Sequence, residues 1–143
     1  MPSEDARANL AREGIGETRI RFVGNVMIDT LLAQAARARV LDFPRRLGLE
    51  GGAFVVATLH RPSTVDEPEM LAAALEGLRS VARELPVVLP LHPRTRRNCE
   101  RFELTSLLDG IRVLEPVGYL EMLSLVSQSA LVMTDSGGLQ EET

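Results

Sequence analysis

The sequence predicts an α/β fold of three layers, in which helices cover both faces of a mainly parallel sheet. Short apolar runs alternate with segments of helical periodicity from residue 53 onward, and this alternation is typical of βαβ units. The first of these runs, residues 53–59, is apolar at almost every position, as expected for a strand that is buried on both faces. The 143 residues are 45% hydrophobic, which is enough for one domain of ordinary size.

The first third of the chain predicts a helix, a strand, a second helix and a loop. Ser3 is a plausible N-cap for a helix over 4–13, since serine is among the preferred capping residues. Residues 19–24 predict a strand. Within 26–41 the apolar residues recur at helical spacing, which predicts the second helix. Proline and glycine are frequent over 42–52, and they predict a segment that is mostly loop.

Strands and helices then alternate to the end of the chain. The predicted strands cover residues 53–59, 86–91, 111–115 and 130–134. The predicted helices cover residues 67–85, 94–107 and 118–128. Gly137 and Gly138 would open a further helix, of which the sequence contains only the beginning. We therefore interpret the chain as a truncated piece of a longer protein of two domains.

Composition and charge exclude several classes of function. The net charge is −4 and the isoelectric point is near 5.2, whereas general nucleic-acid binding rests on a basic surface. All 16 basic residues are arginine, so lysine Schiff-base chemistry is excluded within this chain. The single cysteine, Cys99, cannot form an internal disulfide. No apolar run approaches the ~18 residues of a membrane span, and the start lacks the pattern of a signal peptide, so we expect a cytoplasmic protein without a membrane partner.

Histidines follow two of the predicted strands, at the end where open α/β sheets bind their ligands. His60 and Arg61 follow the first buried strand, and His92 and Arg94 follow the second. Each histidine would bind a phosphate or transfer a proton; the alternative is a structural or solvated side chain. A metal site is disfavoured, because no further ligand with a recognisable spacing accompanies them.

A glycine-rich turn follows the last predicted strand. In Ser136-Gly137-Gly138 the two glycines would let the backbone approach an anion closely, and the N–H groups of the following helix would point at it. The alternative is a plain tight turn between a strand and a helix. The histidines at the neighbouring strand ends favour the phosphate site.

Five motifs occur together in one order along the chain. They are Gly24-Asn25-Val26-Met27-Ile28-Asp29, Thr58-Leu59-His60-Arg61-Pro62-Ser63, Pro90-Leu91-His92-Pro93-Arg94-Thr95, Glu115-Pro116-Val117-Gly118-Tyr119 and Thr134-Asp135-Ser136-Gly137-Gly138-Leu139-Gln140-Glu141-Glu142. This set resembles the non-hydrolysing UDP-N-acetylglucosamine 2-epimerases over almost the whole chain. The resemblance implies a Rossmann-like half of a glycosyltransferase-B-like fold. Residues 25–143 would be an incomplete UDP-binding domain, and residues 1–24 the end of a preceding domain or a linker.

The resemblance also implies a reaction. The family interconverts UDP-N-acetylglucosamine and UDP-N-acetylmannosamine by removing the C2 proton, expelling UDP and adding it back with C2 inverted. No metal or organic cofactor is needed, the complete protein is commonly a homodimer, and the products feed surface polysaccharide synthesis. The family's proton-transfer carboxylates belong to the first domain, so we expect this chain alone to be inactive. Two alternatives remain: a UDP-sugar-binding module without catalysis, and a related UDP-sugar hydrolase or glycosyltransferase.

By motif position, the resemblance implies which residues bind UDP and which assists the chemistry. His60 is the catalytic candidate and would assist the departure of UDP. The diphosphate would bind to Ser136, Gly137 and Gly138. Glu142 would accept hydrogen bonds from the ribose hydroxyls, because a carboxylate can accept from two donors at once.

The resemblance also implies roles around the rest of the nucleotide. Val117 and Met122 would border the uracil, and Met122 stands where many members have phenylalanine. His92 and Arg94 would line the cleft near the nucleotide. Asp135 would orient the turn that follows it.

Overall fold

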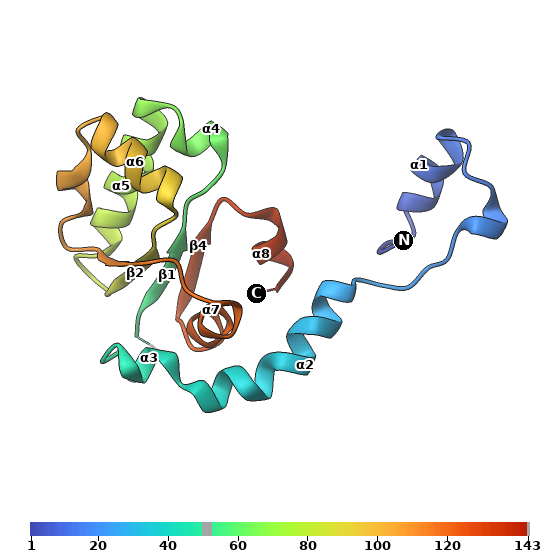
Figure 1. The fold of residues 1–143 in the computed structure, drawn as a ribbon, viewed down its shortest axis with the longest axis horizontal. Helices are drawn as coiled ribbons and strands as arrows, with labels where there is room; N and C mark the ends of the chain where they lie inside the picture. The colour runs from blue at the N-terminus through green and yellow to red at the C-terminus, as the bar shows by residue number, and fades with distance from the viewer. Residues whose placement is uncertain (50–52, 143) are drawn as a thin grey trace.

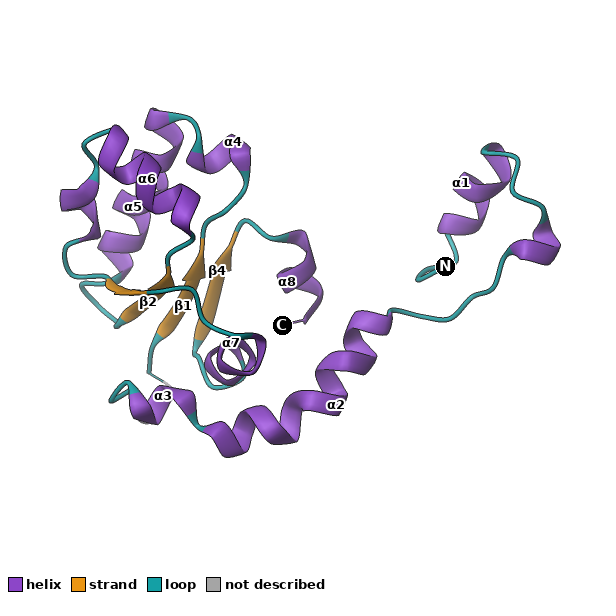
Figure 2. Cartoon of the chain, in the orientation of Figure 1, coloured by secondary structure: helices purple, strands orange, loops and turns teal. Residues whose placement is uncertain are grey.

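The computed structural model describes residues 1–49 and 53–142, and the side chains up to Gln140. At its centre is a parallel sheet of four strands in the order β3-β2-β1-β4 (Figures 1 and 2). The strands are β1 (Val55–Thr58), β2 (Val87–Pro90), β3 (Arg112–Leu114) and β4 (Leu131–Thr134). Each lies within a strand predicted from residue 53 onward, so the parallel sheet is confirmed.

Helices cover both faces of this sheet (Figure 1). The helices on one face are α4 (Pro62–Val65), α5 (Pro68–Val81) and α6 (Pro93–Arg101). The helices on the other side are α3 (Phe43–Arg46), α7 (Tyr119–Val126) and α2 (Val26–Leu41), which packs against α7. The predicted three-layer α/β arrangement is therefore confirmed.

Two hydrophobic clusters hold the layers together, because successive residues of a strand point to opposite faces of a sheet. Val55 of β1 belongs to the cluster that contains Leu71 and Leu75 of α5. The next residue, Val56, belongs to the cluster that contains Leu125 of α7. All of these side chains are completely buried, and full burial of such a side chain contributes roughly 1.5–3 kcal/mol.

The order in which the chain adds strands to the sheet reverses at β1: β2 and β3 lie on one side of β1, and β4 lies on the other. From β1 the chain passes through α4 and α5 to β2, and then through α6 to β3. It returns through α7, on the other face, to β4, which pairs with β1. Such a reversal is a topological switch point, and ligands of open α/β sheets bind outside the carboxyl ends of the strands there. The topology therefore predicts a ligand site at the carboxyl ends of β1 and β4.

The N-terminal segment agrees only in part with its prediction. Helix α1 (Ala6–Arg12) confirms the predicted helix, but the strand predicted over 19–24 is wrong. Phe22 and Val23 are exposed, and the Val23 N–H donates to the carbonyl of Met1 instead of to a neighbouring strand. Figure 1 shows this segment well away from the sheet, so an apolar run with a strand-like pattern has no strand to pair with.

Some predicted helices differ in their length or number. Helix α5 ends before the limit predicted by 67–85. The helix predicted over 94–107 is divided at Glu103, whose φ of 58° is left-handed and cannot continue a right-handed helix. A separate 3-10 helix, η2 (Thr105–Leu108), follows it. The segment 42–52, expected to be mostly loop, contains α3, and its last residues lie outside the described part.

Candidate functional site

A cavity of about 350 Å³ lies at the carboxyl ends of β1 and β4. The residues that line it from the strand ends are Thr58, His60, Ser136 and Gly138. The residues that line it from the helices are Met27 of α2, Tyr119 of α7 and Leu139 of α8 (Gly137–Glu142). The structure thus brings His60 and the Ser136 turn, which are far apart in the sequence, to one cavity at the switch point.

The Ser136 turn is held by hydrogen bonds from both of its sides. The Ser136 N–H donates to Oγ1 of Thr134, at 2.9 Å. The hydroxyl of Ser136 accepts from the N–H of Leu139, at 3.3 Å, as an N-cap side chain does. The loop therefore presents its backbone to the cavity in a fixed conformation.

Because Gly137 and Gly138 have no side chain, other groups can approach the backbone of this turn closely. A Cβ atom at Gly137 would lie 3.4 Å from Nη2 of Arg61, and one at Gly138 would lie 3.4 Å from Cε of Met27. The guanidinium of Arg61 therefore lies next to the turn, where it adds positive charge. Positive charge beside a backbone that has no side chain is a suitable environment for an anion.

Asp135 contacts the segment that follows β1. Its Oδ2 accepts from the backbone N–H groups of His60, at 2.9 Å, and Arg61, at 2.8 Å. Its Oδ1 lies 2.8 Å from Nδ1 of His60. The Asp135 side chain is 12% exposed and that of His60 is 48% exposed, so a nearly buried carboxylate holds an accessible imidazole. These contacts cross to the neighbouring strand end, and the expectation that Asp135 also orients its own turn stays a prediction.

His92 and Arg94 do not line this cavity. Arg94 forms an ion pair with Asp66, in which Nε donates to Oδ1 at 2.8 Å and Nη2 contacts Oδ2. Asn98 donates to the same carboxylate, at 3.1 Å. The Nδ1 atom of His92 accepts from the N–H of Arg94, at 3.2 Å, and so caps α6. In this structure both residues serve the start of α6, and their expected place beside a nucleotide stays a prediction.

The expected uracil neighbours lie on the α7 side of the cavity. Met122 lines a small adjoining cavity of about 60 Å³ together with Tyr119 and Leu139. Val117 lies half-buried in the segment that leads into α7, outside the lining of both cavities. Glu142, the expected ribose ligand, belongs to α8, but its side chain lies outside the described residues.

Four residues of the lining were missed by the sequence interpretation, namely Met27, Thr58, Tyr119 and Leu139. All four lie inside the recognised motifs, which were the signal that could have found them. Tyr119 is 44% exposed and lines the cavity. Its position in the first turn of the helix after β3 places it on the carboxyl side of the sheet.

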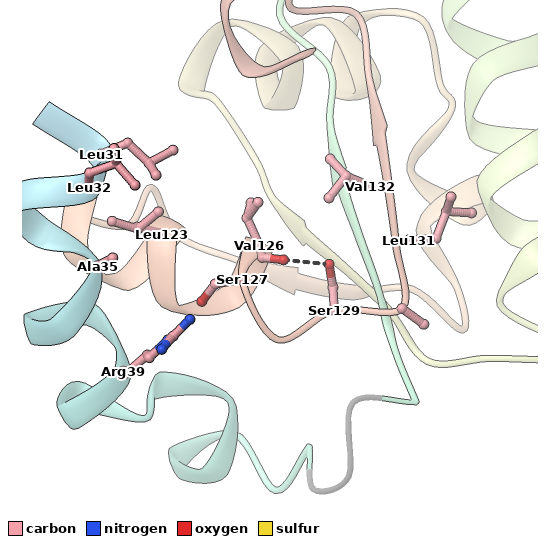
Figure 3. Close-up of a pocket in the computed structure, with 11 residues that line it drawn as sticks. Leu31, Leu32, Ala35, Arg39, Leu123, Val126, Ser127, Ser129, Leu131 and Val132 are labelled. Atoms are coloured by element: carbon pink, nitrogen blue, oxygen red, sulfur yellow. Dashed lines mark hydrogen bonds between the residues drawn. The ribbon is translucent and has the colours of Figure 1, made fainter. Parts of the chain in front are cut away.

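A larger cavity lies elsewhere, at the amino end of β4. It has a volume of about 560 Å³ and lies between α2, α7 and the start of β4 (Figure 3). Leucine and valine side chains such as Leu31, Leu123 and Val132 line it, with Arg39 at its side. Because ligands of open sheets bind at the carboxyl ends of the strands, this groove is not the candidate active site.

Two further kinds of feature are absent from the described residues. Among the described side chains, those of 1–49 and 53–140, no group of three or more histidine, cysteine, aspartate or glutamate residues is placed to hold a metal ion. Within the same ranges no helix has the length and apolar content needed to cross a membrane.

Comparison with known proteins identifies the family. The sequence model described as UDP-N-acetylglucosamine 2-epimerase matches residues 1–143. A UDP-2,3-diacetamido-2,3-dideoxy-D-glucuronate 2-epimerase from Pseudomonas aeruginosa is 44% identical, over 99% of this chain and 39% of that protein. A UDP-N-acetylglucosamine 2-epimerase from Methanocaldococcus jannaschii is 37% identical, over 99% of this chain and 41% of that protein.

Solved structures agree with the sequence comparison. The crystal structure of the Methanocaldococcus jannaschii UDP-GlcNAc 2-epimerase in complex with UDP-GlcNAc and UDP superimposes with a TM-score of 0.86 at 36% identity. The superposition covers 99% of this chain and 41% of that one. The chain thus spans about 40% of the length of the relatives that it matches. With its whole length matched by the family model, this chain belongs to the UDP-N-acetylglucosamine 2-epimerase family.

Proposed function

We propose that this chain forms the UDP-binding part of a non-hydrolysing UDP-N-acetylglucosamine 2-epimerase. The observation that supports this most directly is the meeting of His60 and the Ser136 turn around one cavity at the switch point. The relatives support the same proposal, since the Methanocaldococcus jannaschii structure contains UDP-GlcNAc and UDP.

The diphosphate would bind at the turn formed by Ser136, Gly137 and Gly138. The backbone approaches the cavity closely there, and the Arg61 guanidinium lies beside Gly137. Such charge-assisted hydrogen bonds are the strong ones for phosphate. Glu142 would bind the ribose, a role that rests on its motif position alone.

The uracil would then extend toward α7. Met122 and Tyr119 line the small cavity that adjoins the main one, which supports a place for the base beside Met122. The role of Val117 would be played through its backbone, since its side chain lines neither cavity.

In the reaction, the C2 proton is removed and the bond between C1 and the diphosphate oxygen breaks, so that UDP leaves with the bonding electrons. A 2-acetamidoglucal forms, and UDP adds back with C2 inverted. His60 lines the cavity next to the turn, where its imidazole would stabilise the departing diphosphate by hydrogen bonding. The base that removes the C2 proton would belong to the part of the enzyme that this chain does not contain.

A second substrate is favoured by one specific observation. The Pseudomonas aeruginosa relative, at 44% identity, is named for a UDP-2,3-diacetamido-2,3-dideoxy-D-glucuronate. That nucleotide sugar and UDP-N-acetylglucosamine both contain UDP and a 2-acetamido group, so one diphosphate site and one C2 chemistry would serve either. Parallel assays of the complete protein with both sugars would decide which one it epimerises.

Calorimetry on the 143-residue chain tests the binding role. We expect UDP to bind and uridine, which lacks the diphosphate, to bind far more weakly. Equal binding of the two ligands would contradict a diphosphate site. NMR detection of UDP-N-acetylmannosamine tests the chemistry, and we expect turnover of UDP-N-acetylglucosamine by the complete protein and none by this chain alone. Binding of UDP without turnover by the complete protein would favour the non-catalytic alternative.

From the resemblance we also infer that the complete protein is a cytoplasmic homodimer and that its product enters surface polysaccharide synthesis. Light scattering on the complete protein tests the first inference. A monomer at micromolar concentration would contradict it.

A further inference from the structure

We propose that Asp135 is a positioning residue that holds His60 as the tautomer protonated on Nδ1 and leaves Nε2 unprotonated and available to the cavity. The role of this tautomer in the departure of UDP rests on the proposed function, whereas the assignment of the tautomer rests on the contacts alone. The proposal follows from the contacts between the ends of β1 and β4.

Both oxygens of the Asp135 carboxylate lie against one short segment, which contains His60 and Arg61. Oδ2 takes the backbone N–H groups of His60 and Arg61, at 2.9 and 2.8 Å. This fixes the carboxylate relative to the main chain from which the imidazole projects. Oδ1 is buried and forms no hydrogen bond with the described residues as they are placed, but it lies 2.8 Å from the ring atom Nδ1, a distance at which a hydrogen bond forms once the ring N–H is directed at it.

The chemistry of the carboxylate determines where the proton resides. An ionised carboxylate only accepts hydrogen bonds, and a neutral imidazole carries one donor and one acceptor nitrogen. Nδ1 beside Oδ1 must therefore be the donor, and Nε2 is left as the acceptor. The Asp135 side chain is only 12% exposed, so water competes little for this carboxylate.

This tautomer suits a group that acts on a departing diphosphate. With Nδ1 turned to the carboxylate, Nε2 is the ring nitrogen left to contact a phosphate oxygen, and it donates to that oxygen when it carries a proton. The same division of labour, in which a buried carboxylate sets the tautomer and orientation of a histidine, operates in the serine protease triad. Asp135 would act through His60 and would not touch the nucleotide.

His92 offers an internal comparison. It is the only other histidine in the chain, and its Nδ1 accepts from the N–H of Arg94, at 3.2 Å. An accepting Nδ1 requires the proton on Nε2. The two histidines of this chain should therefore be opposite tautomers when both are neutral.

NMR of the chain labelled with ¹⁵N-histidine measures this directly, at a pH about two units above the ordinary histidine pKa of ~6.5. Protonated and unprotonated ring nitrogens have well separated ¹⁵N shifts, and the variant His92→Gln assigns the two spectra. We expect His60 to show a protonated Nδ1 and His92 a protonated Nε2. The same tautomer for both, or a protonated Nε2 on His60, would overturn the proposal.

The variant Asp135→Asn tests the cause. The amide oxygen of the new asparagine would still accept hydrogen bonds from the backbone N–H groups of His60 and Arg61. Its NH₂ group would then face Nδ1 of His60, so that Nδ1 must become an acceptor. We expect the His60 Nδ1 resonance to move downfield while that of His92 stays unchanged. The matched control is Asp66→Asn, which makes the same change at the Arg94 ion pair and should leave the His60 tautomer as it is. An unchanged His60 tautomer in a folded Asp135→Asn chain would refute the role of Asp135.

Two further measurements separate the positioning role of Asp135 from a folding defect and from the proposed function. If Asp135→Asn does not fold, the tautomers of the unaltered chain decide alone, by the criterion given above. Calorimetry with UDP is carried out on the unaltered chain in parallel. Opposite tautomers without UDP binding would leave the positioning role standing and count against the proposed function.

Discussion

The hydroxyl oxygens of Thr58 and Thr134 lie 2.6 Å apart and join the carboxyl ends of β1 and β4. The two residues are also partners in the sheet register. Oγ1 of Thr134 additionally accepts from the N–H of Ser136. One side-chain pair therefore links the end of β1 to the turn that we propose as the diphosphate site.

Removal of the Thr58 hydroxyl should weaken this link. Thr58→Val keeps the shape and the strand propensity but leaves Thr134 without its partner, so we expect a loss of about 1 kcal/mol of folding free energy. The affinity for UDP should fall as well, because Thr134 holds Ser136. Thr58→Ser retains the hydroxyl and serves as the control. Urea denaturation and calorimetry compare the variants, and equal stability of both with the parent chain would show that the pair contributes nothing.

A side chain at Gly137 should block the diphosphate without disturbing the fold. The Cβ of Gly137→Val would contact only the flexible end of Arg61, but its branch would occupy the space from which a phosphate approaches. We expect UDP binding to be lost while the melting temperature changes little. The variant Gly77→Ala, on the exposed side of α5 where an added Cβ meets nothing within 4 Å, should leave UDP binding intact and stabilise the helix by about 0.5–1 kcal/mol. Normal UDP binding by Gly137→Val would place the phosphate elsewhere.

The sheet could be predicted because its strands have a local signature. Residues 53–59 and 86–91 are nearly continuous apolar runs, and Val55 and Val87 are completely buried within them. The segment 19–24 contains isoleucine, phenylalanine and valine together with two arginines and a glycine. It has strand-forming residues but no neighbouring strand among the described residues, and a local pattern contains no information about the existence of a partner. The same reasoning therefore succeeded for one set of strands and failed for the other.

The contacts within the site depend on long-range pairing, which explains which of them were missed. In the sheet, β4 pairs with β1 and not with β3, the strand that precedes it in the sequence. Only this reversal brings Asp135 to His60, 75 residues away. The pairing of Arg94 with Asp66 likewise depends on how α4 and α6 pack together, so the motif position of Arg94 alone suggested a different role.

Replacement of His60 should separate catalysis from binding. His60→Asn keeps the backbone N–H that Asp135 accepts but removes the imidazole. In the complete enzyme we expect UDP affinity to change by less than about tenfold, or ~1.4 kcal/mol, and kcat to fall by considerably more. Steady-state kinetics and calorimetry on the same preparation measure both quantities. A loss of UDP affinity as large as the loss of kcat would make His60 a binding residue only.

Truncation of leucine should destabilise the chain far more in the core than on the surface. Leu75 of α5 is completely buried, so Leu75→Ala removes contacts and leaves a cavity, at a cost of about 2–5 kcal/mol. Leu32 of α2 is 65% exposed, and Leu32→Ala should change stability by no more than about 0.5 kcal/mol. Urea denaturation measures the difference. A similar loss from both variants would mean that α2 is packed more closely in solution than its exposure indicates.

The buried thiol of Cys99 should make the chain less stable in alkaline solution. Cys99 is 1% exposed, and burial raises the pKa of its thiol above the ordinary value, while the nearby Arg96 acts in the opposite direction to a lesser extent. Above about pH 8.5, the unfolded chain loses this proton first. The folded state then binds more protons than the unfolded state, so the free energy of unfolding falls as the pH rises. Below the pKa of the unfolded thiol, Cys99 contributes no pH dependence.

The variant Cys99→Ala isolates this effect, because every other titrating group is common to both chains. We expect the difference in unfolding free energy between the parent and Cys99→Ala to be constant below about pH 8 and to fall by up to ~1.4 kcal/mol per pH unit above it. The fall should end where the pH passes the raised pKa of the folded thiol. Urea denaturation at several pH values provides the curve. A difference that stays constant through the alkaline range would mean that the thiol ionises as readily in the folded chain as in the unfolded one. Burial of Cys99 in the cluster with the α5 leucines argues against that outcome.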